Sequence, residues 1–470
     1  MQPESIRFKE LAARALADEP LQRSMVATGP HFVLKRAKAR VALPEFDELR
    51  DAARDIKNHV LAHLDVYLEK FEAQVQAAGG HVHWAATAED ARAIILKIAA
   101  EKRARIITKG KSMVSEEIGL NEALAAAGHD PVETDLGEYL IQIRGERPSH
   151  IIAPAVHLRR EQIEADFRRV HDQFNPARDL SQIPALVEEA RRVLRQKYLD
   201  ADIGITGANF LVAETGSCIV VTNEGNGDLT RLLPKTHIVV TAIEKVVPTL
   251  EDASTLLRVL ARSATGQDFS TYTTLMTGPR RTGDPDGPEE FHVVLLDNGR
   301  SNVLGTVFQD MLRCIRCGAC LNHCPVYQAV GGHAYGWVYP GPIGSVVTPA
   351  LIGIENAANL PNASTFCGRC EEVCPVRIPL PRLLRHWREQ EFEKHLTPPA
   401  VRSGLWAWAF LAQRPGLYVL AMRLAARFLK WRGKNGRIAI LPLASGWTRT
   451  RDFPAAQGKT FTELWRERQS

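Results

Sequence analysis

The chain has 470 residues, of which 45% are hydrophobic and 24% are charged. This composition is ordinary for a globular protein, and the length predicts about two to four domains. The net charge of +5 is only mildly basic, and no compact basic motif accompanies it, which argues against a nucleic-acid-binding protein.

The beginning of the chain mixes acidic and basic side chains and has no apolar core segment, so we expect no secretory signal. No window holds about 18 uninterrupted apolar residues, so we expect no transmembrane helix. Seven of the eight cysteines crowd at close spacing. In a chain without a leader, such spacing favours metal binding over disulfides. We therefore expect a cytoplasmic protein.

The stretch from Phe8 to about residue 78 has a helical pattern and ends at the stop signal Gly79-Gly80. Thr87 and Asp90 then have the spacing of a capping box, which predicts that a helix begins there. We expect an N-terminal helical segment over residues 1–40. The apolar positions with helical spacing are Leu49, Ala53, Ile56, Val60 and Leu64.

Strand-like segments alternate with helical ones between residues 80 and 300. The segments expected as strands are 81–84, 105–108, 131–134, 150–153, 210–213, 218–222, 238–241 and 292–296. A charged helical connector over 158–199 separates two halves of this stretch. The alternation predicts an α/β domain with a largely parallel sheet over residues 41–300.

Three weaker signals lie in this domain. Lys109-Gly-Lys-Ser112 lacks the upstream glycine of a phosphate-binding loop, so we interpret it as a strand-to-helix turn with Ser112 near the cap. Glu214–Ser217 and Asn223–Gly227 are expected to be turns, with pocket lining at the carboxyl edge of the sheet as the alternative. The sequence has no glycine fingerprint for a nicotinamide or flavin nucleotide.

Residues 301–392 carry the cysteine motifs. A Cys-x₂-Cys-x₂-Cys run surrounds one iron–sulfur cubane, and the following Cys-Pro cysteine ligates the other cluster. This crossover rule assigns Cys314, Cys317, Cys320 and Cys374 to cluster one, and Cys324, Cys367 and Cys370 to cluster two. Zinc sites use two pairs of ligands and do not need this run. Cys218 stands apart in a predicted strand and is excluded from the ligands.

Cluster two lacks a fourth cysteine, because Ser364 stands three residues before Cys367. Three cysteines can hold a [3Fe–4S] cluster, or a [4Fe–4S] cluster with a non-cysteine or exogenous fourth ligand. Ser364 is a candidate for the missing ligand, but iron prefers thiolate, so an ordinary loop serine is the favoured interpretation.

Residues 393–470 form a basic, tryptophan-rich tail. Its tryptophans are Trp406, Trp408, Trp431, Trp447 and Trp465. The segment 413–416 interrupts its apolar stretch, so neither half is long enough to span a bilayer. We expect the tail to pack on this protein or on a partner subunit, with contact to the inner face of the membrane as the alternative.

The motifs at 314–327 and 374–380, together with 207–217 and 222–226, resemble the lactate utilization protein B family. The resemblance covers the whole chain. It implies an α-helical ferredoxin module over 301–392 and a NagB/RpiA/CoA-transferase-like α/β domain. It further implies two [4Fe–4S] clusters held by the seven cysteines, and action with two other lactate-utilization proteins.

On this basis we expect an electron-transfer subunit for the oxidation of L-lactate to pyruvate rather than an enzyme acting alone, with no catalytic residue assigned. One alternative is a carrier for another 2-hydroxy acid, such as glycolate. A second is a transferase-like ligand-binding activity in the α/β domain, with Glu214 or Glu224 as the nucleophile, which rests on fold analogy.

Overall fold

The computed structural model describes residues 3–469 except 111, 442–444 and 449. The chain divides into two compact units, Met1–Glu391 and Phe392–Ser470. Lys111 of the predicted turn at 109–112 lies outside the described residues.

The first unit begins with a helical segment, as predicted. Its elements are η1 (Ser5–Arg7), α1 (Phe8–Ala17), α2 (Glu19–Val41), α3 (Phe46–Ala62) and α4 (Leu64–Ala77). Ala53, Val60 and Leu64 of the predicted apolar stripe are buried. Arg50 and Lys57 share the buried side of α3, at 3% and 2% exposure, although charged side chains are rarely buried so fully without partners.

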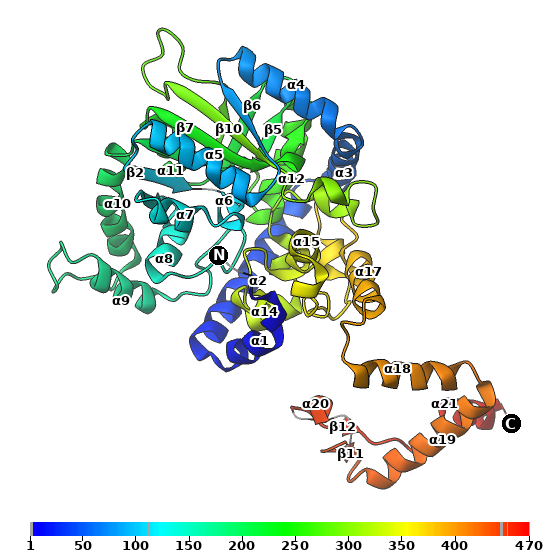
Figure 1. Ribbon diagram of the computed structural model, residues 1–470. Helices are drawn as coiled ribbons and strands as arrows, with labels where there is room; N and C mark the ends of the chain where they lie inside the picture. Colours follow the sequence, from blue (N-terminus) through cyan, green and yellow to red (C-terminus); the bar gives the residue numbers. More distant parts are fainter. Residues whose placement is uncertain (1–2, 111, 442–444, 449, 470) are drawn as a thin grey trace. The chain divides into compact units, whose positions relative to one another are not determined.

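Six parallel strands form the central sheet in the order β1-β10-β7-β4-β2-β3 (Figure 1). They are β1 (His81–Ala85), β2 (Ile106–Gly110), β3 (Asp130–Glu133), β4 (Ile203–Thr206), β7 (Thr236–Ala242) and β10 (Glu290–Leu296). All neighbouring pairs are parallel. The predicted α/β sheet is therefore confirmed, and its inner strands are apolar because both faces are covered.

Alternate residues of the inner strands enter two different cores. Val240 and Val294 pack with α5 residues on one face, while Val239 and Val293 pack on the other, as the two-residue period of a strand requires. The helices of this domain are α5 (Ala88–Glu101), α6 (Met113–Glu117), α7 (Leu120–Ala126), α8 (Leu136–Arg144), α9 (Arg160–Val170), α10 (Ile183–Leu199), α11 (Asn226–Leu232), η2 (Ile243–Lys245) and α12 (Leu250–Ala264).

Local chemistry explains where several of these elements begin. The Thr87 side chain accepts from the Asp90 N–H at 3.1 Å and the Asp90 carboxylate accepts from the Thr87 N–H at 3.0 Å, so the predicted capping box is confirmed. Ser112 caps α6 by accepting from the Ser115 N–H at 3.1 Å. The interpretation of Ser112 as a helix cap is thus confirmed as well.

A smaller sheet has the order β8-β5-β6-β9. Its strands are β5 (Phe210–Val212), β6 (Ser217–Thr222), β8 (Val246–Val247) and β9 (Tyr272–Met276). Strands β5 and β6 are antiparallel, and the turn between them contains Glu214, as predicted. The stretch 223–225 instead leads from β6 directly into α11.

The strand predicted at 150–153 is wrong. These residues form an irregular loop between α8 and α9. The loop is held by the cluster module instead of a sheet: the Ser149 carbonyl accepts from the Tyr327 hydroxyl at 2.7 Å, and His150 Nε2 lies 3.1 Å from Asn322 Oδ1. Ile151 is buried beside the cysteines, and Ile152 and Ala153 are partly buried, so the loop has the apolar run that is typical of a strand.

The cysteine-bearing region completes the first unit. Its elements are η3 (Ser301–Val303), η4 (Gln309–Arg313), α13 (Ala319–Asn322), α14 (Pro325–Val330), η5 (His333–Tyr335), α15 (Gly341–Ile352), η6 (Ile354–Asn356), α16 (Arg369–Glu372) and α17 (Leu380–Glu393). It packs against the N-terminal helices, since α1 contacts α14, α2 contacts α13 and α14, and α3 contacts η4 (Figure 1).

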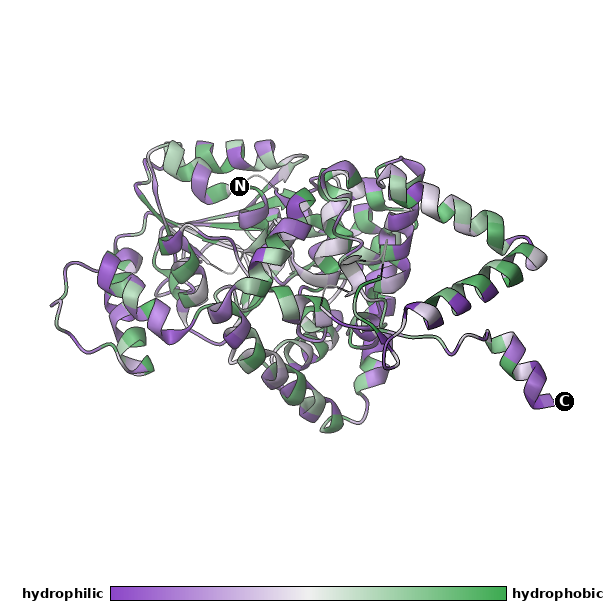
Figure 2. Cartoon of the chain, turned by 90° about the horizontal axis from the view of Figure 1, so that it is seen from below, coloured by the Kyte–Doolittle hydropathy of each residue, from purple (hydrophilic) through white to green (hydrophobic). Residues whose placement is uncertain are grey.

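The second unit contains α18 (Pro399–Ala412), α19 (Pro415–Arg432), β11 (Arg437–Ile438), α20 (Ser445–Thr448), β12 (Phe453–Pro454) and α21 (Phe461–Gln469). No residue of α18 or α19 is buried. Trp406 is 70% exposed and Trp431 is 76% exposed, and Figure 2 shows hydrophobic residues interspersed with hydrophilic ones on the helices that lead to the C-terminus. Among the described residues, no helix has the length and apolar character needed to cross a membrane.

Candidate metal centre

The two cysteine loops have the same backbone. Arg316 and Phe366, each directly before a cysteine, have φ of 60° and 55°. Gly318 and Gly368, each directly after that cysteine, have φ of 73° and 79°. Positive φ at a non-glycine residue is sterically costly. Its repetition in both loops shows that the cysteine spacing imposes one particular turn, which leads into α13 in the first loop and α16 in the second.

The first group of thiols surrounds a small cavity. Cys314, Cys317, Cys320 and Cys374 all line it, although Cys374 is distant in sequence from the other three. Burial raises the pKa of Cys317 to about 12, and the neighbouring thiols of Cys374 and Cys314 add to that rise. The chain thus brings together the four cysteines that the crossover rule assigns to cluster one.

The second group consists of Cys324, Cys367 and Cys370. Burial raises the pKa of Cys370 to about 12, with the thiols of Cys324 and Cys367 as further causes. Cys367 differs because it is exposed, and the Arg369 N–H that points at its sulfur lowers its pKa. The three cysteines predicted for cluster two are therefore neighbours, at a site that is open to solvent on one side.

The two groups of thiols approach each other. Burial raises the pKa of Cys320, and Cys370 of the other group contributes to that rise along with the cysteines of its own group. Tyr335 is fully buried, its hydroxyl has no hydrogen-bond partner among the described residues, and the thiols of Cys324, Cys320 and Cys370 lie near it. A buried donor without a partner is rare, and sulfur atoms of two clusters would provide acceptors on both sides.

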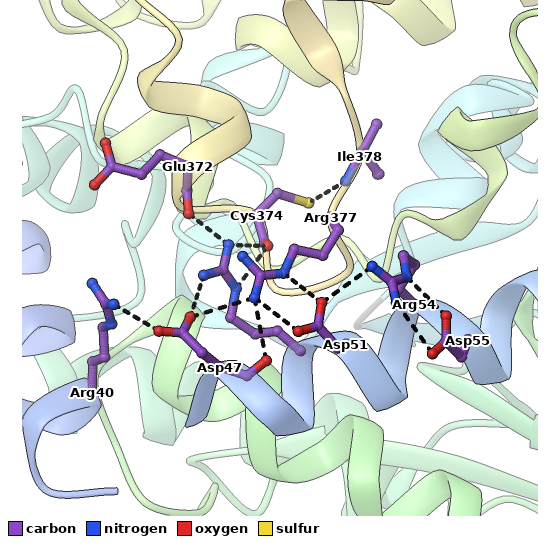
Figure 3. Close-up of polar contacts among 10 residues, drawn as sticks. Arg40, Asp47, Asp51, Arg54, Asp55, Glu372, Cys374, Arg377 and Ile378 are labelled. Atoms are coloured by element: carbon purple, nitrogen blue, oxygen red, sulfur yellow. Dashed lines mark hydrogen bonds and ion pairs between the residues drawn. The ribbon is translucent and has the colours of Figure 1, made fainter. Parts of the chain in front are cut away.

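The donor set fits iron–sulfur clusters. Buried thiols with raised pKa values bind metal only as thiolates, and metal coordination deprotonates them outright. Backbone donors already point at the sulfurs: the Arg316 N–H lies 3.4 Å from Cys314 Sγ, and the Ile378 N–H lies 3.4 Å from Cys374 Sγ (Figure 3). Hydrogen bonds to the ligand sulfurs are one of the means by which proteins adjust cluster potentials.

Two arginines of the N-terminal helices hold the second cysteine motif. Arg50 donates to the Glu372 carbonyl at 2.6 Å and to the Cys374 carbonyl at 2.8 Å and 3.1 Å. Arg36 donates to the Val373 carbonyl between them at 2.9 Å. The carbonyls at the end of a helix have no partner within the helix, so these arginines complete the C-terminal end of α16.

The same face of α3 makes a second, more exposed contact with this motif. Arg377, the third residue after Cys374, has Nε 3.0 Å from Asp51 (Figure 3). Arg54, on the neighbouring turn, pairs with Asp55 at 2.8 Å. The buried arginines and these ion pairs were not identified from the sequence. Their signal is the position of Arg50 in the apolar stripe of α3, where it follows Phe46 and precedes Ala53.

A buried charge network joins the α/β domain to the first cysteine loop. Arg300 pairs with Glu117 at 2.6 Å and with Glu244 at 2.9 Å, and Arg316 Nη2 lies 3.4 Å from Glu244. Lys57 donates to the Glu244 carbonyl, and burial lowers its pKa to about 8. Lys57 and Arg316 of this network lie near the Cys314 thiol.

A cavity of about 390 Å³ lies at the carboxyl edge of the central sheet, where open α/β sheets bind ligands. Segments that follow β2, β3, β4 and β7 line it, together with Asn223 and Glu224. For residues 223–224, the alternative interpretation as pocket lining is therefore correct. Glu214 lies in the hairpin turn, outside the lining, and its carboxylate accepts from the Leu250 N–H at 3.1 Å.

This cavity borders the first group of thiols. Arg316, between Cys314 and Cys317, lines it, and Ile151 lines both this cavity and the one among the thiols. Arg316 is held over the Tyr339 ring at 4.5 Å, and its Nη1 is buried with no hydrogen-bond partner among the residues that the structure describes. Lys245 also lines the cavity, is 7% exposed and makes no hydrogen bond within the described part of the chain.

The remaining predicted residues have structural roles. Lys109 ends β2 with its ammonium 2.7 Å from Glu116 and 2.6 Å from Glu133. Cys218 is fully buried in β6 within the hydrophobic core, and burial raises the pKa of its thiol.

Comparison with known proteins agrees with this arrangement. The LUD domain family matches residues 68–296, and a 4Fe-4S dicluster domain family matches residues 310–378. The family described as lactate utilisation protein B, C-terminal, matches residues 369–470. A solved DUF162 family protein from Deinococcus radiodurans covers 50% of this chain and 98% of its own length, at 16% identity and a TM-score of 0.29.

Three relatives span nearly the whole chain. Lactate utilization protein B from Geobacillus thermodenitrificans is 47% identical and covers 91% of this chain and 90% of its own. The protein of the same name from Bacillus licheniformis is 44% identical, covering 98% and 97%. An electron transport protein of Escherichia coli, YkgF, is 43% identical, covering 97% and 96%. The chain belongs to the lactate utilization protein B family.

Proposed function

We propose that the chain carries electrons through two iron–sulfur clusters during the oxidation of L-lactate to pyruvate. The observation that carries this proposal is the division of seven cysteines into two neighbouring groups, in a chain closely similar to proteins named for lactate utilization. Cys314, Cys317, Cys320 and Cys374 hold cluster one, and Cys324, Cys367 and Cys370 hold cluster two. Both are [4Fe–4S] clusters in this proposal.

The chain's own residues position and tune these groups. When bound, each cluster accepts and releases one electron at a time. The backbone N–H groups of Arg316 and Ile378 stabilise the electron-rich sulfurs. Buried cations such as Arg36 and Lys57 offset the added negative charge. Tyr335 lies beside thiols of both groups, and its buried hydroxyl would donate a hydrogen bond to a cluster sulfur there.

The carbon chemistry belongs to a partner in this proposal. Oxidation of lactate to pyruvate releases two electrons and two protons, and it needs a hydride or carbanion acceptor at the hydroxy-acid carbon. We assign that step to one of two other lactate-utilization proteins. The exposed tryptophans of the second unit, among them Trp406 and Trp431, favour a protein contact there, with a membrane surface as the alternative.

The test uses anaerobically purified protein with and without those partners. We expect L-lactate to reduce the clusters, seen as bleaching of their visible absorption, only when the partners are present. Reduction by the chain alone would contradict a pure carrier role. Reduction by glycolate in preference to lactate would favour the alternative 2-hydroxy acid.

We also propose the domain limits 41–300, 301–392 and 393–470. The first of these domains is assigned to the NagB/RpiA/CoA-transferase-like class. The all-parallel six-stranded sheet with a cavity at its carboxyl edge supports that class. Limited proteolysis tests the limits, because exposed linkers between domains are cut first.

A second candidate function is binding of an organic anion in the cavity beside cluster one. Its acidic lining is largely engaged: Glu244 pairs with Arg300 and Arg316, and Asp135 caps α8. The donors that remain are Arg316 Nη1 and the Lys245 ammonium. Burial lowers the pKa of Lys245 to about 8, so it is still mostly charged at neutral pH. A carboxylate would fit between these two donors.

Lys245→Met tests this binding. We expect pyruvate or L-lactate to change the EPR spectrum of reduced cluster one in the unaltered chain and to have at least tenfold weaker effect in the variant, because a buried charge-assisted hydrogen bond is lost. Lys235→Met is the matched control, since Lys235 is 81% exposed and its only described ion pair, to Glu289, spans 3.9 Å. An unchanged response in Lys245→Met would contradict the assignment. Glu224→Gln tests the transferase alternative, which fails if that variant keeps full function.

A further inference from the structure

The two cysteine motifs are repeats of one pattern that differ at a single ligand position. Counted from the central Cys-Gly pair, Cys317 corresponds to Cys367, Cys320 to Cys370, and Cys324 to Cys374. The residue that corresponds to Cys314 is Ser364. Ser364 therefore occupies a ligand position of the second loop, and all the other ligand positions of that loop are cysteines.

The backbone places the Ser364 hydroxyl as it places the Cys314 thiol. The Arg316 N–H lies 3.4 Å from Cys314 Sγ, and the Phe366 N–H lies 3.1 Å from Ser364 Oγ. The residue that donates is the one with positive φ in both loops. The other ligands repeat as well, since the Ala319 N–H points at Cys317 as the Arg369 N–H points at Cys367.

The loop that carries Ser364 is held by contacts with side chains of this chain. Arg388 of α17 donates to the Pro361 carbonyl at 2.9 Å and to the Ser364 carbonyl at 3.2 Å. Its guanidinium also lies over the Phe366 ring at 4.1 Å. These contacts hold the backbone on both sides of Ser364, so the hydroxyl needs little further ordering to reach a metal ion.

We propose that Ser364 Oγ is the fourth protein ligand of cluster two. This inference rests on the proposed function, which supplies the cluster itself. Oγ binds the fourth iron as an alkoxide, its proton passes to solvent, and the water that otherwise occupies that iron is released. Solvent reaches the site, because Cys367 is exposed and Ser364 is only half-buried.

Iron prefers thiolate to a serine oxygen. At the fourth iron of cluster two, however, the ligand that competes with the serine oxygen is water. A ligand held in place by its own loop has a large effective concentration relative to a free one. Cluster two is consequently a [4Fe–4S] cluster with one iron bound to oxygen, and that iron is the most easily lost of the four.

The experiment compares three variants of the full chain, purified anaerobically: Ser364→Ala, Ser364→Cys and the control Thr365→Ala. Iron content, EPR of the oxidised protein and Mössbauer spectra are the measurements. We expect Ser364→Ala to lose about one iron atom per chain and to gain the EPR signal of a [3Fe–4S] cluster. Ser364→Cys is expected to keep that iron and to lose the Mössbauer signature of an oxygen-bound site.

Thr365→Ala removes the hydroxyl that hydrogen-bonds to the Cys367 thiol but is not at a ligand position, so it is expected to shift the spectra of cluster two without producing the EPR signal of a [3Fe–4S] cluster. The proposal is wrong if Ser364→Ala retains the iron content and spectra of the unaltered chain, or if the unaltered chain itself holds only three iron atoms at this site. Absence of one cluster altogether would instead contradict the proposed function.

Discussion

Cys374→Ala is expected to damage cluster one, although Cys374 belongs to the second motif. Its thiol lines the cavity formed by Cys314, Cys317 and Cys320, so its removal takes one of four thiolates from that cluster. We expect at least a tenfold fall in the EPR signal of intact cluster one, since even weaker perturbations around metal ligands cost about 10–100-fold in metal affinity. The signal of cluster two should persist.

Paired variants identify the clusters without a prior spectral assignment. Cys374→Ala and Cys320→Ala should remove the same EPR signal, whereas Cys324→Ala and Cys370→Ala should remove the other. Cys218→Ala is the control, because Cys218 is buried in the core of the α/β domain. If Cys374→Ala instead removed the same signal as Cys370→Ala, the crossover between the motifs would be refuted.

Arg50→Met is expected to destabilise the first unit and to loosen cluster one. The side chain is 3% exposed and satisfies the carbonyls of Glu372 and Cys374. Without it these acceptors remain buried and unpaired, at a cost of about 3 kcal/mol in total. We expect the thermal midpoint of unfolding to fall by roughly 5 °C, with faster loss of the visible absorption of the clusters.

Arg54→Met is the matched control on the same helix. Arg54 is 36% exposed and pairs with Asp51 and Asp55 at the surface, where an ion pair contributes about 0–1 kcal/mol. Its midpoint should stay within about 1–2 °C of the unaltered chain. Equal shifts in the two variants would show that the buried contacts of Arg50 to the Cys374 loop do not stabilise the site.

Local chemistry made much of the fold predictable. The capping box at Thr87, the Ser112 cap and the strands of the central sheet depend on neighbours within a few residues and on the period of apolar residues. The stretch 150–153 was mistaken for a strand because Ile151 is buried beside the cysteines and Ile152 and Ala153 are partly buried, which gives the loop the same apolar run.

The features of the candidate metal site also fall into those that the sequence determines and those that depend on the tertiary structure. The sequence by itself determined the seven cysteines and the family, and it predicts the division of the cysteines between two clusters, because ligand spacing along a short loop is a local constraint. Only the tertiary structure decided that Arg36 and Arg50 close the end of α16 and that a cavity reaches Arg316. Those features depend on contacts between residues as many as 337 positions apart, and no local pattern records which distant side chains will meet.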